Sequence, residues 1–252
     1  MTRNEKIERA RAKTWFYPYR LPDGSMVHTY NQGKVDSIHT TRAAMLDQCL
    51  AETLGSGAGE CDAIDLACHQ GYFSVNLAQK GLRRVLAVDA RAEHVADTRL
   101  IADILQLRNI ETRQADIFAL PAQALGNFDV VLMFGLLYHL ENPVGALRLA
   151  RALTRRVCLI ETQVVPNMSG QVDWGSYEFV RPLKGVFGII DEVDETHGAE
   201  ASITGVCLAP SVEGLLWTMR AAGFSQARVL PVPEDGYEQL KYGKRVMVAG
   251  MP

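Results

Sequence analysis

The segment from Asp65 to Ser74 constrains the fold of this 252-residue chain more than any other. It comes directly after the short apolar run 63–66 and leads into an amphipathic run that ends at Gly81. This order predicts a strand, a tight turn and a helix, the arrangement that holds a nucleotide-like ligand at the N-terminus of a helix. The segment therefore predicts an α/β protein with a ligand site at this turn.

Two further acids follow apolar runs in the same way. Asp89 ends the run 84–88, and Asp116 comes after another short β-like run. A carboxylate at the end of the second strand can accept hydrogen bonds from both hydroxyls of a ribose. Together with Asp65, these acids at three strand ends outline an adenosine pocket, in which Asp116 and Ile117 are expected to hold the adenine.

Apolar and amphipathic runs alternate through the chain, which predicts a parallel sheet with helices on both faces. The expected strands lie near 62–67, 84–89, 110–114, 128–134 and 156–162, and the expected helices over 72–80, 92–106 and 143–153. Further helices are expected over 36–54 and after the N-cap residue Ser211. The runs 227–230 and 245–249 should complete the sheet as an antiparallel pair.

The predicted fold class is therefore α/β, a doubly wound, mostly parallel seven-stranded sheet with an N-terminal cap and a lid insertion. The expected parts are a cap and helix (1–57), a cofactor-binding half (58–162), the lid insertion (163–209), and a C-terminal helix and strands (210–252). The insertion lacks periodicity, and a connection of this length inside a compact domain is usually a functional lid or disordered. Its large aromatic side chains argue against simple disorder.

The turn after the first strand resembles that of the class I methyltransferases, which use S-adenosylmethionine. Their glycine motif reads Asp-x-Gly-x-Gly-x-Gly, and Ala67 and His69 stand here at the first two glycine positions, so that only Gly71 remains. Small Ala67 still permits close approach of a ligand, and His69 places a side chain beside the methionine part of the cofactor. With the acids and the apolar run 128–134, this resemblance implies the Rossmann-like methyltransferase fold and S-adenosyl-L-methionine as the cofactor.

The residues expected to bind this cofactor come from the turn and the strand ends: Asp65, Ala67, His69, Gly71, Asp89, Ala90, Asp116, Ile117, Met133, Phe134 and Tyr138. A doubly wound domain that binds another nucleotide, or none, is the alternative. A nicotinamide dehydrogenase fits less well, because its glycine fingerprint is not met.

Composition excludes several other classes of protein. The formal charge of −3 and the pI of about 6.1 argue against a large nucleic-acid footprint. No window approaches the ~18 uninterrupted apolar residues that span a bilayer, and the charged N-terminus is not a secretory signal. The five cysteines are scattered and form no C-x-x-C pair. We therefore expect no metal site and no membrane contact, and a cytoplasmic location.

The fourth strand runs into a loop that contains Tyr138 and His139. Ligands of open α/β sheets lie across the carboxyl ends of the strands, so this loop should face the sulfonium of the cofactor. An imidazole with a pKa near ~6.5 suits proton removal from an alcohol or amine, so His139 is the candidate base. The alternative is that His139 only fixes the loop. Tyr138 is expected to line the pocket near the methyl group.

A narrower resemblance covers about residues 60–250. It is carried by the stretches 135–139, 161–162, 208–211, 215–217, 222–224 and 244–246, and by Pro143. They are similar to the catalytic domain of the bacterial tRNA wobble-uridine carboxymethyltransferases, which use a carboxylated S-adenosylmethionine. The resemblance implies that Met133, Tyr138 and Arg245 lie around the donor. That family's lysine and tryptophan set for the extra carboxylate is not matched over residues 15–39, so the ordinary donor is favoured.

The leading hypothesis is methyl transfer to an oxygen, nitrogen or carbon atom of a small molecule, which an aromatic lid and cap could enclose. The residues expected to contact this acceptor are Trp15, Tyr17, Trp174, Tyr177 and Arg245. The runner-up is a methyl- or carboxymethyltransferase acting on the wobble uridine of tRNA, with phosphates bound by Arg3, Arg9, Arg11 and Lys13. A run of mixed charge is more often a solvated helix face. A third hypothesis is a non-catalytic cofactor-binding partner protein.

Overall fold

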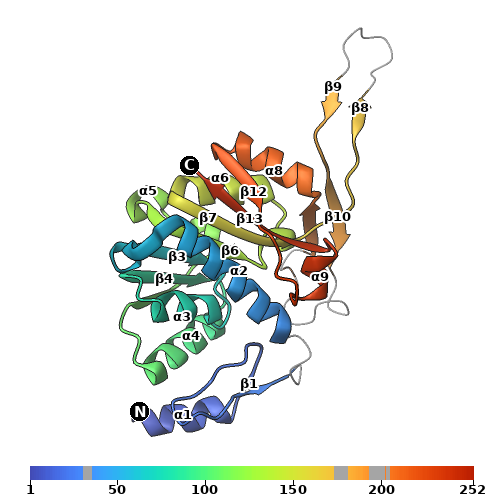
Figure 1. The fold of residues 1–252 in the computed structure, drawn as a ribbon. Coiled ribbons are helices and arrows are strands. Elements are labelled where there is room, and N and C mark those ends of the chain that lie inside the picture. The colour runs from blue at the N-terminus through green and yellow to red at the C-terminus, as the bar shows by residue number, and fades with distance from the viewer. Residues whose placement is uncertain (31–35, 173–180, 193–201, 203–204) are drawn as a thin grey trace.

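A seven-stranded sheet forms the centre of the molecule in the computed structural model, which describes residues 1–30, 36–172, 181–192, 202 and 205–252 (Figure 1). The strands, in spatial order, are β12 (Gln226–Val229), β13 (Arg245–Met251), β7 (Thr154–Gln163), β6 (Phe128–Phe134), β3 (Asp62–Leu66), β4 (Arg84–Asp89) and β5 (Ile110–Gln114). The five strands from β7 to β5 pair in parallel, whereas β13 is antiparallel to both of its neighbours. The predicted fold class is confirmed, and so is the antiparallel pair at its end.

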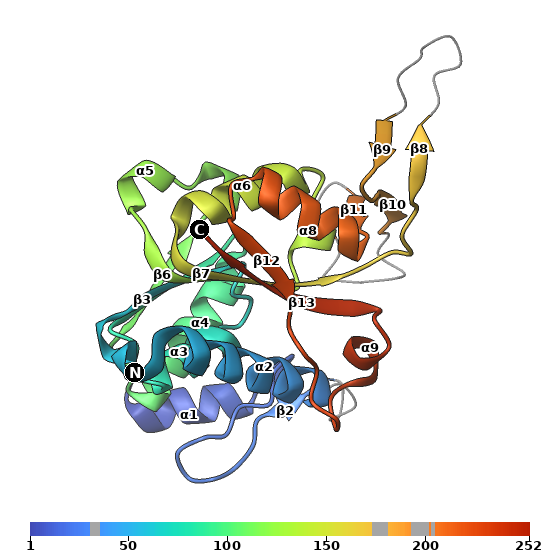
Figure 2. The same ribbon diagram turned by 45° about the horizontal axis from the view of Figure 1, so that its top comes forward.

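Helices cover both faces of the sheet (Figure 2). On one face lie α2 (Asp36–Leu54), α3 (Tyr72–Gln79) and α4 (Ala92–Leu105), and on the other lie α5 (Ala122–Leu125), α6 (Pro143–Leu153) and α8 (Val212–Ala221). Short helical turns complete the fold at η1 (Gly55–Glu60), η2 (Ile117–Ala119), η3 (Leu137–His139) and α9 (Glu238–Lys241). The two apolar faces of the sheet therefore give two cores, one under each helical layer.

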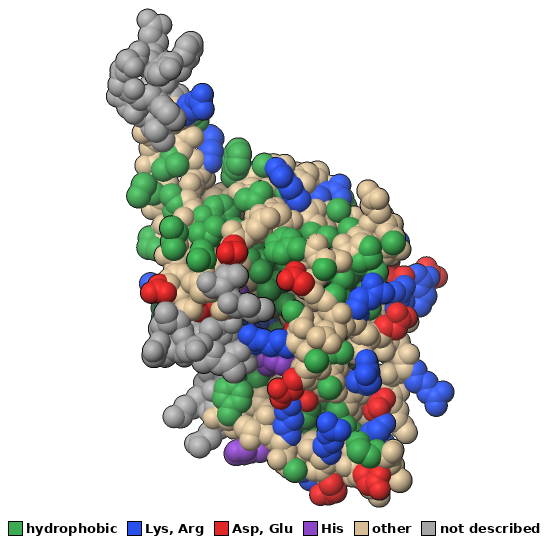
Figure 3. All heavy atoms as spheres, turned by 180° about the vertical axis from the view of Figure 1, so that it is seen from behind, with side chains coloured by type: hydrophobic (Ala, Val, Ile, Leu, Met, Phe, Trp, Pro, Cys, Tyr) green, Lys and Arg blue, Asp and Glu red, His purple; other side chains and the backbone are tan. Residues whose placement is uncertain are grey.

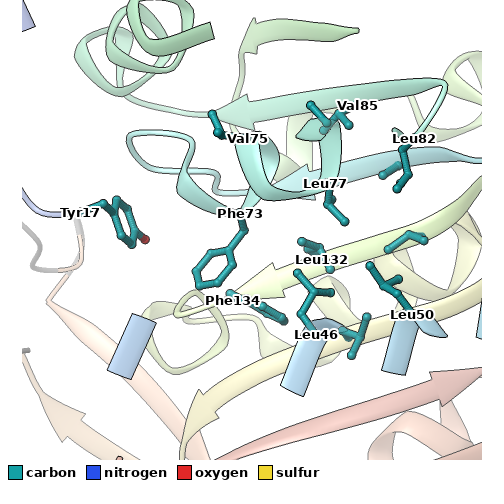
Figure 4. Packing of buried hydrophobic residues seen from close by; sticks show 14 of the residues in the cluster. Tyr17, Leu46, Leu50, Phe73, Val75, Leu77, Leu82, Val85, Leu132 and Phe134 are labelled. Atoms are coloured by element: carbon teal, nitrogen blue, oxygen red, sulfur yellow. The ribbon is translucent and has the colours of Figure 1, made fainter. Parts of the chain in front are cut away.

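The first of these cores shows why helix-spaced apolar residues are needed. Leu46 and Leu50 lie one turn apart on α2, and both point toward the sheet near Leu132 of β6 (Figure 4). Leu77 of α3 reaches the same cluster, and all four side chains are buried. Burying such a side chain fully stabilises the fold by about 1.5–3 kcal/mol, so this packing fixes α2 and α3 on the sheet.

The N-terminal residues form a cap whose helix α1 (Arg3–Arg11) packs against α4. A capping box begins the helix, because Thr2 accepts a hydrogen bond from the amide of Glu5 while the Glu5 side chain accepts one from the amide of Thr2. Two short strands, β1 (Thr14–Trp15) and β2 (His28–Thr29), follow. Trp15 is fully buried here, and its Nε1 donates to the carbonyl of Ala10 at 2.8 Å. Its expected role in contacting the acceptor is therefore corrected, since it is a core residue.

The predicted lid insertion is more regular than its sequence indicates. Its described residues form two antiparallel pairs, β8 (Gly170–Val172) with β9 (Arg181–Leu183), and β10 (Phe187–Asp191) with β11 (Val206–Pro210). The first pair projects from the body of the molecule as an arm (Figure 1). The expected acceptor contacts Trp174 and Tyr177 lie outside the described residues.

Within the described part of the chain, none of the helices combines the length and the apolar character that crossing a bilayer requires. All five cysteines are buried as free thiols.

Candidate active site

The turn after β3 keeps the backbone of a glycine motif at positions that are not glycine. Ala67 has φ 62° and His69 has φ 52°, which are left-handed values that cost a side chain about 1–2 kcal/mol. Gly71 has φ 87°, and a Cβ placed there would lie 2.5 Å from the Cγ2 of Thr98. The glycine at position 71 is therefore required by α4 packing closely on the turn, whereas positions 67 and 69 keep a glycine-like backbone under strain.

Three of the predicted cofactor residues lie behind the wall of the cavity that this turn borders. Asp65 is buried, and its Oδ2 accepts a hydrogen bond from the hydroxyl of Ser74 at 2.7 Å. Burial raises the pKa of its carboxyl to about 7. Met133 is fully buried in the second core, and Gly71 faces α4. Asp65 thus holds the turn against α3 and does not face the cavity.

Asp89 lies at the end of β4 with both carboxylate oxygens held. Oδ2 accepts from the amide of His69 at 2.8 Å, Oδ1 accepts from the amide of Arg91 at 2.9 Å, and Nδ1 of His94 lies 3.1 Å from Oδ1. Burial opposes ionisation, but these hydrogen bonds and the charge of His94 outweigh it and lower the pKa of Asp89. The His94 ring stacks on His69 with 3.9 Å between centroids. An ionised carboxylate is therefore fixed beside the turn, with His94 as a neighbour that the sequence analysis missed.

A cavity of about 770 Å³ opens along the carboxyl ends of the strands. The predicted cofactor residues that line it are Ala67, His69, Asp89, Ala90, Asp116, Ile117, Phe134 and Tyr138. Of the expected acceptor and catalytic residues, Tyr17, Arg245 and His139 line it too. Asp116 caps the short helix η2, because its Oδ1 accepts from the amide of Phe118 at 2.8 Å. The structure thus brings most of the predicted residues to one cavity.

At the end of this cavity near β6, His139 meets residues of the insertion. Its Nδ1 lies 2.7 Å from Oε2 of Glu192, which also accepts hydrogen bonds from the thiol of Cys207 at 3.1 Å and the amide of Ser202 at 2.8 Å. Burial opposes ionisation of Glu192, but hydrogen bonds from His139 and Cys207 lower its pKa. Burial and the neighbouring Glu192 raise the pKa of Cys207 to about 12.

Potential metal ligands also meet here, because donor atoms of His139, Glu192 and Cys207 lie within 4.8 Å of one another. Nδ1 of His139 and the thiol of Cys207 each lie within hydrogen-bonding distance of Oε2 of Glu192.

A cluster of buried charged side chains also lies at the end of the cavity near β6. Glu161 on β7 is fully buried. Its Oε1 lies 2.6 Å from Nε of Arg245, and its Oε2 lies 2.8 Å from Nη2 of Arg42. Arg245 also donates to the hydroxyl of Tyr138 at 3.0 Å. Burial opposes ionisation of Glu161, but the two guanidiniums lower its pKa, and His39 stays neutral because burial lowers its pKa to about 3. Two positive charges thus meet one negative charge beside the cavity.

Arg42 and Glu161 are two residues of this cluster that are not among those predicted from the sequence. The signal available was a charged residue on the buried face of a helix, three residues after His39 on α2. Glu192 gave no such signal, because it reaches His139 across 53 positions of the chain.

The strand order, the turn and the acid after the second strand together define the fold of the S-adenosylmethionine-dependent methyltransferases. The N-terminal domain of EvdMO1 has this fold, and it was solved with SAH bound and also in the presence of SAH and D-fucose. It is 21% identical to this chain and superposes with a TM-score of 0.72, and the comparison covers 100% of this chain and 97% of that one. Residues 58–174 match the family model described as "Methyltransferase domain". The chain therefore has the fold of these methyltransferases, and residues 58–174 match a methyltransferase domain.

Curated relatives match less of the chain. A tRNA U34 carboxymethyltransferase from Desulfotalea psychrophila is 25% identical over 64% of this chain and 44% of its own length. A ubiquinone biosynthesis O-methyltransferase from Acinetobacter baumannii is 28% identical over 41% of this chain and 43% of its own length. The chain thus spans less than half the length of these relatives.

Proposed function

We propose that this protein transfers a methyl group from S-adenosylmethionine to a small-molecule acceptor that loses a proton in the reaction. The observation that carries the proposal is that one cavity is lined by both the ionised Asp89, after β4, and His139, after β6. A donor and an acceptor bound together in this space are held in line, which is the main requirement of a group transfer.

Several residues of this cavity fit the cofactor. Asp89 accepts from the ribose hydroxyls, and Asp116 with Ile117 holds the adenine, as the sequence predicts. Arg42 offers a guanidinium for the carboxylate of the methionine part, because its charge is not balanced within the cluster at Glu161. When bound, the cofactor would supply a methyl group on a positively charged sulfur, which would leave as the neutral thioether.

After β6, His139 accepts the proton of the acceptor. A general base positioned in this way contributes typically 10²–10⁴-fold to the rate. The hydroxyl of Tyr138 is held by Arg245 at 3.0 Å, and the guanidinium lies 4.9 Å from the centre of the Tyr138 ring. Tyr138 is thus a rigid wall that keeps the acceptor in place beside His139.

A small acceptor is supported by the aromatic wall of the cavity and by two of the similar proteins. Phe16, Tyr17 and Phe134 give the cavity an aromatic wall among its polar lining residues, and a mixed lining of this kind suits a small organic molecule. One relative is a ubiquinone biosynthesis O-methyltransferase, and the EvdMO1 domain was crystallised in the presence of D-fucose.

The tRNA-modifying function is the second candidate, favoured by the similarity to tRNA U34 carboxymethyltransferases. Three of the four N-terminal basic residues proposed for phosphates have partners within the chain. Lys13 pairs with Glu93 and Asp97, Arg11 pairs with Glu8 and Asp23, and Arg3 donates from Nε to the carbonyl of Ile104. On the face shown in Figure 3, acidic and basic side chains are interspersed. A phosphate-binding surface needs basic side chains gathered on one face, so we place this function second.

The proposal is tested by calorimetry with S-adenosylhomocysteine, followed by an assay of its release from S-adenosylmethionine with a panel of phenols and hexoses. We expect binding and turnover of a hydroxylated small molecule, and mass spectrometry of the co-purified cofactor should give the mass of the ordinary donor. Absence of heat would favour the non-catalytic partner protein. Salt-dependent binding of tRNA, with no turnover of small molecules, would favour the second candidate.

His139→Ala should lower turnover of that acceptor by at least about a hundredfold and leave the affinity for S-adenosylhomocysteine nearly unchanged. Joint loss of cofactor affinity and thermal stability would show that His139 only fixes the loop.

A further inference from the structure

Glu192 is the residue of the insertion that enters the active site. It follows β10, its side chain is 1% exposed, and three donors converge on one oxygen, Oε2. A backbone amide can only donate, and the thiol of Cys207 is protonated, so Glu192 is the acceptor for Ser202 and Cys207 alike. A carboxylate with these neighbours is ionised and accepts from the third group as well, which places a proton on Nδ1 of His139.

This proton has a consequence for the other nitrogen of the ring. A neutral imidazole carries one proton, so a proton on Nδ1 leaves the lone pair on Nε2. Free histidine favours the opposite tautomer, with the proton on Nε2, and in that form the ring cannot take a proton from an acceptor at Nε2. A neighbour that selects the tautomer thus decides whether His139 is able to act as a base.

We propose that Glu192 is a positioning residue, which holds His139 in the Nδ1–H tautomer so that Nε2 receives the proton of the acceptor. This inference rests on the proposed function, in which His139 is the base, and it names the acceptor class as a hydroxyl or another group with a proton to lose. The proton passes from the acceptor oxygen to Nε2 while Nδ1 keeps its own proton on the side of Glu192.

The same contact gives the insertion a catalytic role. Glu192 follows directly after Asp191, which pairs with Val206 at the end of the β10–β11 ladder, and Cys207 comes next along β11. The pairing of β10 with β11 therefore fixes the position of Glu192 relative to His139 in η3. β11 is the strand of this pair that contacts η3, so moving the β10–β11 pair away from η3 would remove the hydrogen bond to Nδ1 without touching the turn after β3, where the cofactor is expected.

The proposal is tested by nitrogen NMR of the full chain labelled with ¹⁵N-histidine, at pH 8 and with S-adenosylhomocysteine added. His139→Gln identifies the signals of His139. We expect Nε2 in the shift range of an unprotonated ring nitrogen and Nδ1 in that of a protonated one. In Glu192→Ala the two should exchange ranges. Glu192→Gln keeps an acceptor without the charge, so it should retain the parent tautomer and serves as the variant that preserves packing.

The matched control is Glu141→Gln, which removes a carboxylate from the same cavity wall two positions from His139. It should leave the tautomer unchanged. With an acceptor found in the release assay, Glu192→Ala should lower kcat at least about tenfold with KM for S-adenosylmethionine unchanged. An Nε2–H tautomer in the parent, or an Nδ1–H tautomer that persists in Glu192→Ala, would overturn the proposal. A parent that binds no S-adenosylhomocysteine would overturn the proposed function instead, while the tautomer still decides the role of Glu192.

Discussion

The substitution Glu161→Gln is expected to destabilise this protein severely. Glu161 is the carboxylate between the guanidiniums of Arg245 and Arg42, at 2.6 and 2.8 Å. All three side chains are 6% exposed or less. A neutral amide leaves two positive charges buried side by side with no negative partner. Breaking a buried pair in this way costs about 3–5 kcal/mol, so the free energy of unfolding should fall by that amount.

The assay is urea unfolding of parent and variant at pH 7, followed by circular dichroism. Glu52→Gln is the matched control, because Glu52 pairs with Arg228 at 2.6 Å but both side chains are nearly half exposed. Solvent and salt screen such a pair, so its loss should be small. The reasoning is refuted if Glu161→Gln unfolds at the same urea concentration as the parent, or if the two variants lose equal stability.

The pH dependence gives an independent check. Burial of Glu161 opposes ionisation, but Arg245 and Arg42 hold its folded pKa below the ordinary value of 4.5. Its stabilisation is therefore fully present above about pH 4.5 and is lost as the pH falls through the folded pKa. The parent should lose stability in this acid range, and Glu161→Gln should lack that part of the loss.

Four further substitutions test other parts of the site. Asp89→Ala should weaken binding of S-adenosylhomocysteine at least about tenfold in calorimetry, because the variant loses charge-assisted hydrogen bonds to the ligand. Asp116→Asn should weaken it for the same reason. Unchanged affinity in the folded variants would contradict the assignment of these two residues to the cofactor. Asp65 has a folded pKa of about 7 against an ordinary 3.8, so the parent should lose stability as the pH rises from about 4 to about 7, by at most about 1.4 kcal/mol per pH unit, and Asp65→Asn should not. Gly71→Ala places a Cβ 2.5 Å from Thr98 at φ 87°, which should lower Tm by about 4 °C or more in a thermal melt; an unchanged Tm would mean that α4 moves away freely.

The central sheet and the helices around it follow from local sequence. The helix expected over 36–54 has those bounds in the structure, because its apolar residues recur at helical spacing and glycines follow it. The strands β3, β4 and β6 are buried on both faces, so each is mostly apolar, and within them only Asp65 of β3 and Asp129 of β6 interrupt the apolar residues. The cavity along the strand ends was predictable for the same reason, since most of its predicted residues follow these strands.

The end of the cavity near β6 was less predictable. The strands β8 to β11 are short and lie outside the main sheet, so neither length nor alternation marks them. The pairs that build this end join Glu192 to His139 and Arg42 to Glu161, each across a long stretch of chain. Such contacts are set by where the sheet brings its strand ends and by no local pattern. Trp15 was misassigned because an aromatic cluster at a terminus looks the same whether it packs inward or lines a site.

The backbone at positions 67 and 69 has a bearing on how proteins of this kind are recognised. A glycine motif marks positions whose backbone dihedral angles are left-handed. The presence of glycine is a reliable sign of those angles only where no other residue type adopts them. Ala67 and His69 adopt left-handed angles, at φ 62° and 52°, so the backbone of the turn is kept although two of its glycines are replaced. A search that asks for glycine at these positions passes over such chains, whereas one that asks for two left-handed residues between a buried strand and a helix would find them. Chains set aside as degenerate for the loss of these glycines therefore merit testing for cofactor binding.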